Sequence, residues 1–139
     1  MIFWDASALV PLFILQPTST ELERSIRGRS PVALWWGSVV ECWSAFARLR
    51  REGVIGSDEE GEARQRLGEF WERSDEILPS EEIRRLSGML LLRHVLRAAD
   101  SLQLSAALIY SGTPASGEFF SLDERLKEAA RLEGLTPRP

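Results

Sequence analysis

The sequence predicts a single α/β domain with a central, mainly parallel sheet, and three observations support this fold class. Apolar segments of strand length alternate with helical patterns, an order typical of parallel sheets with right-handed crossovers. Residues 1–4 are apolar without alternation, as in a strand covered on both faces. Residues 96–110 form a helical pattern that is apolar nearly all round, which indicates a buried helix. The 139 residues fit one domain, residues 1–139, with one core.

Helix signals recur along the chain. After the first strand, residues 6–15 have the composition of a buried helix. A Ser or Thr three residues before Glu is the signature of a capping box, which occurs at residues 18–21, 38–41 and 121–124. It predicts helices that end near Gly28, Gly53 and Gly134, in that order. Two further helices are expected, from Ser57 to about residue 71 and from Ser80 to about residue 92.

Four more segments are predicted to be strands. Residues 31–36 and 118–121 are rich in β-forming side chains. Residues 77–79 form a brief strand that stops at Pro79, and residues 135–136 add a marginal last strand. Of the five tryptophans, Trp4 and Trp43 are expected in the core, and some of the others as anchors in an interface.

Composition and cysteine content favour a soluble protein of the cytoplasm. Hydrophobic residues make up 44% and charged residues 27% of the chain. The apolar run 8–15 is far shorter than the ~20 residues that cross a bilayer, and no basic segment precedes it, so we expect no membrane association and no export. Cys42 is the only cysteine, which excludes an intramolecular disulfide. It is expected to be a core residue, because the only histidine, His94, lies far along the chain and leaves no Cys/His zinc site.

The charges give a mixed signal about nucleic acid. The formal net charge of −4 argues against a generally basic nucleic-acid binder. Lys127 is the only lysine, so 16 of the 17 basic residues are arginine. Arginine suits bidentate phosphate contacts, although a compositional bias of the genome gives the same count. Five arginines are weak candidates for contacts with phosphate or a protein partner: Arg24, Arg27, Arg48, Arg50 and Arg51.

Four acidic residues are expected at one edge of the sheet. Asp5 and Asp123 lie just past predicted strand ends, where open α/β sheets bind their ligands. Glu41 and Asp100 lie in the first turns of helices that converge on the same edge. Helix capping is the alternative role for each of them, Asp5 and Glu41 in particular. A buried Asp100 needs compensation beyond the helix N-terminus.

Four close carboxylates predict a cation site, because they repel one another strongly unless cations are present. Oxygen ligands without His or Cys favour hard ions, Mg²⁺ or Mn²⁺, over zinc. The chemistry that uses such a site is phosphoryl transfer, in which metal ions activate water and stabilise the leaving oxygen. Whether one or two ions bind is left open by the sequence.

Four segments, in order, resemble the motifs of PIN-domain nucleases, with the closest likeness to the VapC toxins of VapBC toxin–antitoxin modules. They are residues 5–10, Glu41 near the start of its helix, residues 99–107 and residues 121–126. The resemblance runs from Met1 to about Gly134. Two positions differ from many relatives: Pro11 stands where a lysine is frequent, and Gln103 where a histidine is common.

The resemblance implies a PIN-like three-layer α/β/α domain with endoribonuclease activity that depends on Mg²⁺ (or Mn²⁺). By this resemblance Asp5, Glu41, Asp100 and Asp123 are the catalytic, metal-binding acids. Ser7 and Ser121 supply hydroxyls that support the site. It also implies an RNA substrate, a homodimer, and a cognate VapB-like antitoxin that wraps the toxin and places a chain segment in the acidic pocket.

Two other functions remain open at this point. The first is a PIN-fold module without catalysis that works by binding a protein partner; the intact set of four acids argues against it. The second is a phosphoaspartyl enzyme or receiver domain, which also uses Asp at strand ends. This second reading fits poorly, because the only lysine, Lys127, falls in the last predicted helix and residues 5–7 lack paired aspartates.

Overall fold

A computed structural model describes residues 1–27 and 31–139 of the chain. The strands of this part are β1 (Ile2–Trp4), β2 (Ala33–Trp35), β3 (Asp75–Ile77), β4 (Glu118–Phe120) and β5 (Thr136–Arg138). The helices are α1 (Ala6–Phe13), α2 (Ser19–Ile26), α3 (Ser38–Arg51), α4 (Ser57–Glu72), α5 (Glu81–Arg93), α6 (Ala98–Ser111) and α7 (Glu124–Leu132). None of these helices is long and apolar enough to cross a membrane.

The strands form one sheet in the order β3-β2-β1-β4-β5, and every pairing is parallel. The central strand β1 pairs with β4 in the register Phe3↔Phe119 and Trp4↔Phe120. Both pairs stack, with ring centroids 5.5 Å and 4.5 Å apart, respectively. Because neighbouring side chains of a strand point to opposite faces, the two aromatic pairs anchor the two faces of the sheet.

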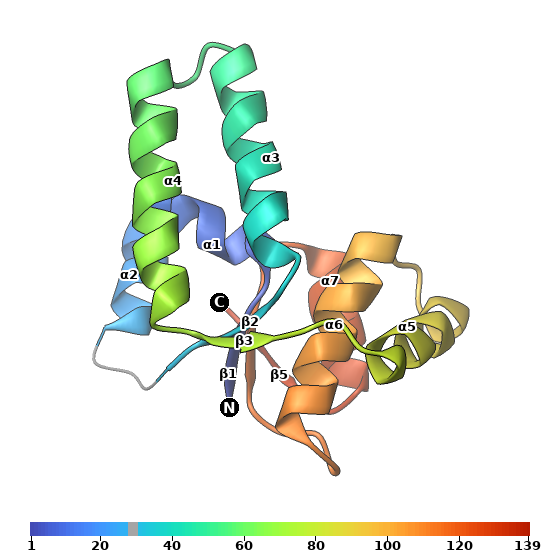
Figure 1. The fold of residues 1–139 in the computed structure, drawn as a ribbon. Coiled ribbons are helices and arrows are strands. Elements are labelled where there is room, and N and C mark those ends of the chain that lie inside the picture. Colours follow the sequence, from blue (N-terminus) through green and yellow to red (C-terminus); the bar gives the residue numbers. More distant parts are fainter. Residues whose placement is uncertain (28–30) are drawn as a thin grey trace.

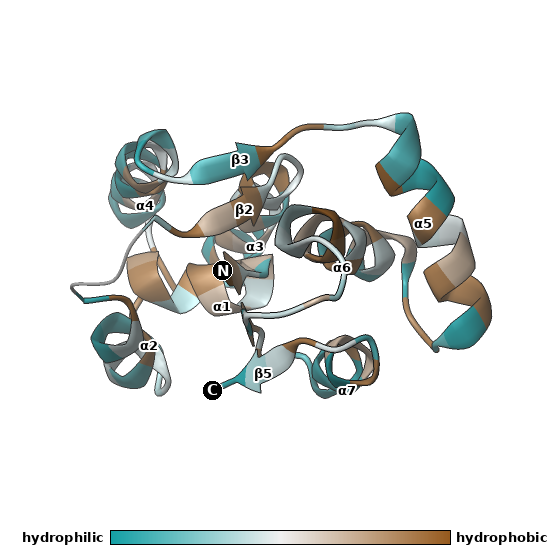
Figure 2. Cartoon of the chain, turned by 90° about the horizontal axis from the view of Figure 1, so that it is seen from below, coloured by the Kyte–Doolittle hydropathy of each residue, from teal (hydrophilic) through white to brown (hydrophobic). Residues whose placement is uncertain are grey.

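Helices cover both faces of this sheet, which confirms the predicted three-layer α/β/α architecture (Figure 1). On one face, Trp4 and Phe120 pack against apolar side chains of α1 to α4. On the other, Phe3 and Phe119 pack against α5, α6 and α7. The segments α1 and parts of α6 are brown in Figure 2, whereas the outer helices α2, α4 and α7 are largely teal. Coverage on both faces explains why residues 1–4 show no alternation of apolar and polar side chains.

The capping-box predictions at residues 18, 38 and 121 are wrong in detail. Thr18 and Gly37 are the residues before α2 and α3, and both have helical backbone angles and make no side-chain cap. A side chain caps the free N–H groups of a helix only when its own residue has an extended backbone. Thr18 and Gly37 therefore do not act as side-chain caps. Before α7 the cap is Asp123 and not Ser121: its Oδ1 accepts the N–H groups of Arg125 and Leu126 at 2.9 and 3.1 Å. The N-cap at Ser80 forms, with the Ile83 N–H at 3.2 Å.

Element boundaries differ from the predicted ones by a few residues. The first helix ends at Phe13, because the backbone of Ile14 is extended. The Ile14 N–H still donates a helical hydrogen bond to the Val10 carbonyl. The edge strand β3 comprises Asp75–Ile77 where residues 77–79 were predicted. Polar Asp75 and Glu76 are compatible with an edge strand, where backbone pairing to β2 defines the strand. The predicted end of the second helix, Gly28, lies outside the described residues.

Candidate functional site

Four helix starts meet at the carboxyl edge of the sheet, and each carries one predicted acid (Figure 1). Asp5 follows β1 directly, and its N–H donates to the Phe120 carbonyl at 2.9 Å. Glu41 lies in the first turn of α3 and Asp100 in the first turn of α6. Asp123 lies between β4 and α7. The parallel topology therefore brings together residues that are up to 118 positions apart in the chain.

Asp5 is held by two hydroxyl groups and not by a helix cap. It occupies the N-cap position of α1 but makes no side-chain cap hydrogen bond. Its Oδ2 accepts hydrogen bonds from the hydroxyls of Ser7 and Ser121, the latter at 2.8 Å. Burial raises the pKa of this carboxyl, the two hydroxyls counteract the rise, and the charge of Asp100 adds to it.

Glu41 is oriented by a buried glutamine that lies opposite it on α6. Gln103 is fully buried, and its Nε2 donates to Glu41 Oε2 at 2.7 Å. The same amide is fixed by Ser38, which accepts from Nε2 at 2.8 Å and donates to Oε1 at 3.1 Å. The pKa of Glu41 is raised from 4.5 to about 7. Burial is the main cause, the hydrogen bond from Gln103 lowers the pKa, and the charges of Asp5 and Asp100 raise it further.

Asp100 and Asp123 are half-buried and lie at the mouth of the site. Asp100 Oδ2 accepts the Arg97 N–H at 3.3 Å, and Asp123 caps α7. The expectation that Asp100 is buried is wrong, because α6 begins at Ala98 and its first turn faces solvent. Desolvation still raises the pKa of Asp100, and the charge of Asp123 raises it further. The hydrogen bond from the Arg97 N–H and the charge of the Arg97 side chain lower it.

The mutual pKa effects link all four carboxyls: Asp100 acts on Asp5, Asp5 and Asp100 act on Glu41, and Asp123 acts on Asp100. As the side chains stand, no three His, Cys, Asp or Glu side chains within residues 1–27 and 31–139 are arranged to hold a metal ion. The donor set nevertheless consists only of carboxylate and hydroxyl oxygens, the chemistry that fits Mg²⁺ or Mn²⁺. Burial is the largest cause of the raised pKa values and repulsion among the carboxyls adds to it, and a divalent cation would offset both by stabilising the charged forms.

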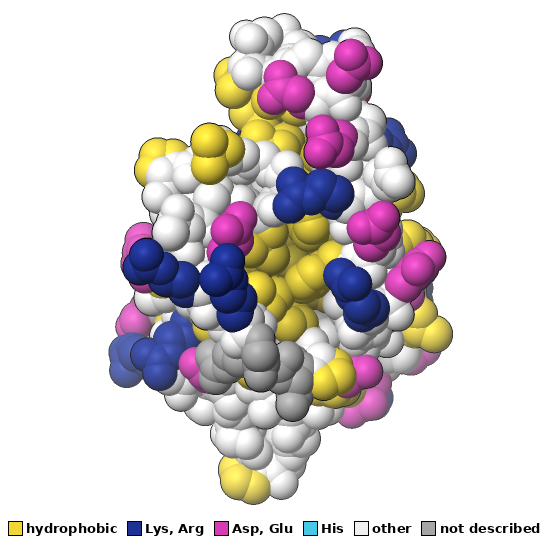
Figure 3. Space-filling model, turned by 90° about the vertical axis from the view of Figure 1, so that its left-hand side faces the viewer, with side chains coloured by type: hydrophobic (Ala, Val, Ile, Leu, Met, Phe, Trp, Pro, Cys, Tyr) yellow, Lys and Arg dark blue, Asp and Glu magenta, His cyan; other side chains and the backbone are white. Residues whose placement is uncertain are grey.

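An apolar groove lies on the side of the sheet covered by α1 to α4. Its cavity has a volume of about 410 Å³ between α1, α2 and α4. Figure 3 shows an apolar floor in yellow with arginine side chains around it. The floor is formed by Leu12, Phe13, Ile26 and Phe70, and the charged rim by Arg27, Arg66, Arg73, Glu23 and Glu69.

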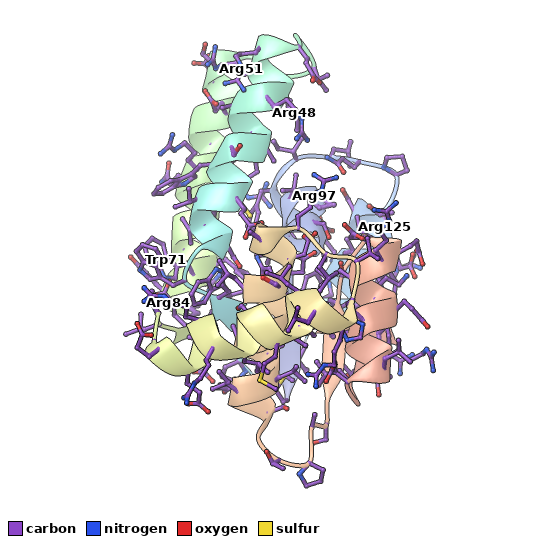
Figure 4. The ribbon with its side chains drawn as sticks, turned by 90° about the vertical axis from the view of Figure 1, so that its right-hand side faces the viewer. Arg48, Arg51, Trp71, Arg84, Arg97 and Arg125 are labelled. Carbon is purple, nitrogen blue, oxygen red and sulfur yellow. The ribbon has the colours of Figure 1, made fainter. Side chains whose placement is uncertain are left out.

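The structure separates the five candidate arginines of the sequence analysis. Arg50 is paired with Glu60 at 2.7 Å. Arg24 belongs to α2 and Arg27 follows it, on the side of the groove. Arg48 and Arg51 lie on α3 and extend to the side shown in Figure 4, together with Arg97 and Arg125. Arg97 and Arg125 were missed, although their spacing from two candidate acids, −3 from Asp100 and +2 from Asp123, was visible in the sequence.

No model of a protein family matches the chain, and no curated protein sequence matches it significantly. Solved structures do match. A toxin–antitoxin complex from Klebsiella pneumoniae superposes with a TM-score of 0.69 at 16% identity, over 98% of this chain and 96% of that chain. VapC20 of Mycobacterium tuberculosis, a toxin that cleaves the sarcin-ricin loop, superposes with a TM-score of 0.68 at 18% identity, over 93% of this chain and 95% of that chain. FitAcB from Neisseria gonorrhoeae superposes with a TM-score of 0.69 at 16% identity, over 98% of this chain and 96% of that chain.

This likeness extends over nearly the whole length of each chain. At such low identities it establishes the fold. The fold implied by the four sequence motifs, a three-layer α/β/α domain around a parallel sheet, is thus confirmed both by the strand order and by these structures.

Proposed function

We propose that this protein is a metal-dependent endoribonuclease, the toxin of a type II toxin–antitoxin module in the cytoplasm. The observation that carries this proposal is the meeting of Asp5, Glu41, Asp100 and Asp123, from four separate elements, at the carboxyl edge of the sheet. The fold adds support, because it is shared with a toxin that cleaves the sarcin-ricin loop and with a toxin–antitoxin complex. A non-catalytic module would have no use for four mutually repelling carboxyls.

Asp5, Asp100 and Asp123 are proposed to hold the principal Mg²⁺ or Mn²⁺ ion. Such an ion supplies a Lewis acid at the phosphodiester and lowers the pKa of water. Ser7 and Ser121 fix the Asp5 carboxylate through its Oδ2. Because both hydroxyls donate to one oxygen, they orient the other carboxylate oxygen as well.

Glu41 is proposed to orient the attacking water and to accept its proton. In the metal-free protein the pKa of Glu41 is about 7, and a bound cation would lower it and keep the carboxylate deprotonated and able to accept a proton. Gln103 keeps its amide N–H on Glu41 Oε2, which aims the free Oε1. Water attacks the phosphorus in line while Glu41 accepts its proton, the bond to the 3′ oxygen breaks, and this oxygen takes up a proton from solvent. The products are a 5′-phosphate and a 3′-hydroxyl.

The apolar groove is the proposed site of the cognate antitoxin. Its apolar floor and its three arginines against two glutamates suit an amphipathic segment with acidic side chains. In this proposal the antitoxin runs from the groove towards the acidic pocket and blocks it. The indole of Trp43, under the Arg64 guanidinium at 4.5 Å, is already engaged within the chain.

A homodimer is proposed through α5. The helix and the residues after it expose Met89 at 50%, Leu92 at 90% and Val95 at 78%. Met89 and Leu92 are three residues apart on α5 and share one face of the helix, and Val95 follows in the extended segment after it. Large exposed apolar side chains on one face are typical of a surface that a partner covers.

The proposal is tested by incubating purified, antitoxin-free protein with a mixed pool of structured RNAs, with Mg²⁺, with Mn²⁺ and with EDTA. Cleavage is expected only with a divalent ion. Asp5→Asn and Asp100→Asn are expected to abolish it, with unchanged circular dichroism. Metal-independent cleavage, or full activity of Asp5→Asn, contradicts the proposed mechanism. No cleavage by the folded wild-type protein favours the protein-binding module instead.

A further inference from the structure

Arg97 and Arg125 belong to the arginines that have no ion pair among the described residues, and unlike the others of this group they border a cavity with two candidate metal ligands. Arg50, Arg84, Arg93, Arg131 and Arg138 each pair with a glutamate. Arg97 and Arg125 are exposed, and no such pair forms at either. Their guanidinium groups therefore remain available for an external anion.

The two arginines line the same cavity as two of the candidate metal ligands. This cavity of about 400 Å³ is bordered by Arg97, Arg125, Asp100 and Asp123. A third acid at its wall, Glu124, is paired with Lys127 at 3.1 Å. Figure 4 shows Arg97 and Arg125 at the starts of α6 and α7, close to each other on one side of the molecule. One pocket thus contains two carboxylates and two guanidinium groups that form no ion pair among the described residues.

Each arginine is tied to its neighbouring acid through the backbone. The Arg97 N–H donates to Asp100 at 3.3 Å, and the Arg125 N–H donates to Asp123 at 2.9 Å. These hydrogen bonds fix the arginine backbones relative to the acids while the side chains stay unpaired. The positive charge of Arg97 also lowers the pKa of Asp100, so its guanidinium acts on this carboxyl without forming an ion pair with it.

We propose that Arg97 and Arg125 form a clamp for an RNA phosphate next to the one that is cleaved. The clamp rests on the proposed function, because the carboxylates are taken to be occupied by the cation. Arginine presents two parallel N–H donors to phosphate oxygens, which positions a strand without reading its bases. Arg48 and Arg51, on the same side of the molecule, continue the path along α3.

The test measures cleavage and binding separately. In the wild-type background, Arg97→Ala and Arg125→Ala are each expected to raise KM for a cleaved RNA roughly 10-fold, with kcat little changed. In the Asp5→Asn background, binding of a fluorescein-labelled single-stranded oligoribonucleotide is titrated against salt. Each variant is expected to lower the slope of log K against log salt by about 0.7, the value for one lost phosphate contact.

The matched control is Arg24→Ala, which removes the same charge from α2, on the other face of the sheet. Arg97→Lys is expected to keep the salt slope and to recover KM only in part, because lysine lacks the bidentate fork. Values equal to those of Arg24→Ala, in both KM and slope, overturn the clamp. If the wild-type protein cleaves no RNA, the proposed function fails, and the binding titration alone decides on the clamp.

Discussion

Gln103 shows how a buried polar side chain serves the site without belonging to the set of acids. It lies among apolar neighbours of α6, and its amide is spent on Ser38 and Glu41. A buried amide without partners would cost about 1–3 kcal/mol, so the three hydrogen bonds also make its burial tolerable. In the sequence, Gln103 stands out only because it occupies a position where a histidine is common. Its contact with Glu41 spans 62 positions and depends on how α3 and α6 pack.

Gln103→Ala is therefore expected to reduce kcat by about 10- to 100-fold, the range for partners that orient metal-site residues. The reason is that Glu41 loses the donor that aims its carboxylate. In a double-mutant cycle with Glu41→Gln, the effect of Gln103→Ala on kcat should vanish. The amide in the Glu41→Gln variant cannot accept the proton, so its orientation no longer matters for the rate.

The control for this cycle is Ser105→Ala on the same helix. Ser105 is buried and exchanges a hydrogen bond with Ser87 at 2.8 Å, away from the acids. The Ser105→Ala substitution should lower thermal stability and leave kcat unchanged. An equal loss of kcat from Gln103→Ala in the wild-type and Glu41→Gln backgrounds would show that Gln103 does not act through Glu41.

Among the elements, α5 carries the clearest sign of a partner, because Met89 and Leu92 are exposed on one face of the helix and Val95 is exposed just after it. Leu92→Glu is expected to convert a dimer into a monomer, because it places a charge within a surface that dimerisation desolvates. Since the side chain is 90% exposed, the fold should tolerate the change. Light scattering after size exclusion measures the mass directly.

Leu15→Glu is the matched control, because Leu15 is 89% exposed and follows α1 on the other face of the sheet. It should leave the mass unchanged. A wild-type monomer at the concentrations used for activity, or a dimeric Leu92→Glu variant, would contradict the proposed interface.

The elements themselves were largely predictable, and the reason is the strength of the buried patterns. The central strands β1 and β4 carry buried aromatic residues, and α6 is apolar nearly all round, so their patterns are strong although the strands are short. The edge strand β3 was misplaced because backbone pairing with β2, and not side-chain pattern, determines its extent. The caps at Thr18 and Ser38 failed because a capping box depends on the backbone angles of the first residue, which the residue types alone do not fix.

For the whole molecule, the parallel topology is what brings four scattered acids to one edge of the sheet. Predicting that strands end at Asp5 and Asp123 and that helices begin near Glu41 and Asp100 was enough to expect one cluster. The contacts that refine it were not predictable. The link of Gln103 to Glu41, like the cavity shared by Arg97 and Arg125, arises between elements whose relative placement is set by packing.

The raised pKa values predict how stability depends on pH. Glu41 has a folded pKa of about 7 against an ordinary 4.5, so the folded state holds a proton that the unfolded chain has released between these values. The free energy of unfolding of the metal-free protein should therefore fall as pH rises from about 4.5 to 7, and Asp5 and Asp100 shift it in the same direction. Added Mg²⁺ should restore stability above that window.

Thermal unfolding in EDTA, across this pH range, measures the effect, and Glu41→Gln isolates the share of Glu41. The variant should show a flatter pH dependence than the wild-type protein. Identical slopes for the two proteins would mean that Glu41 does not titrate in the folded state as described.

The central claim is that Asp5, Glu41, Asp100 and Asp123 form one divalent-cation site, and calorimetric titration with Mn²⁺ tests it most directly. The account predicts binding to the wild-type protein at pH 8 that is weakened at least about 10-fold in Asp5→Asn, Asp100→Asn and Asp123→Asn, and less in Glu41→Gln. Asp58→Asn, in the first turn of α4, should bind like the wild-type protein. Unchanged Mn²⁺ affinity in Asp5→Asn, or no binding to the folded wild-type protein, would contradict the account.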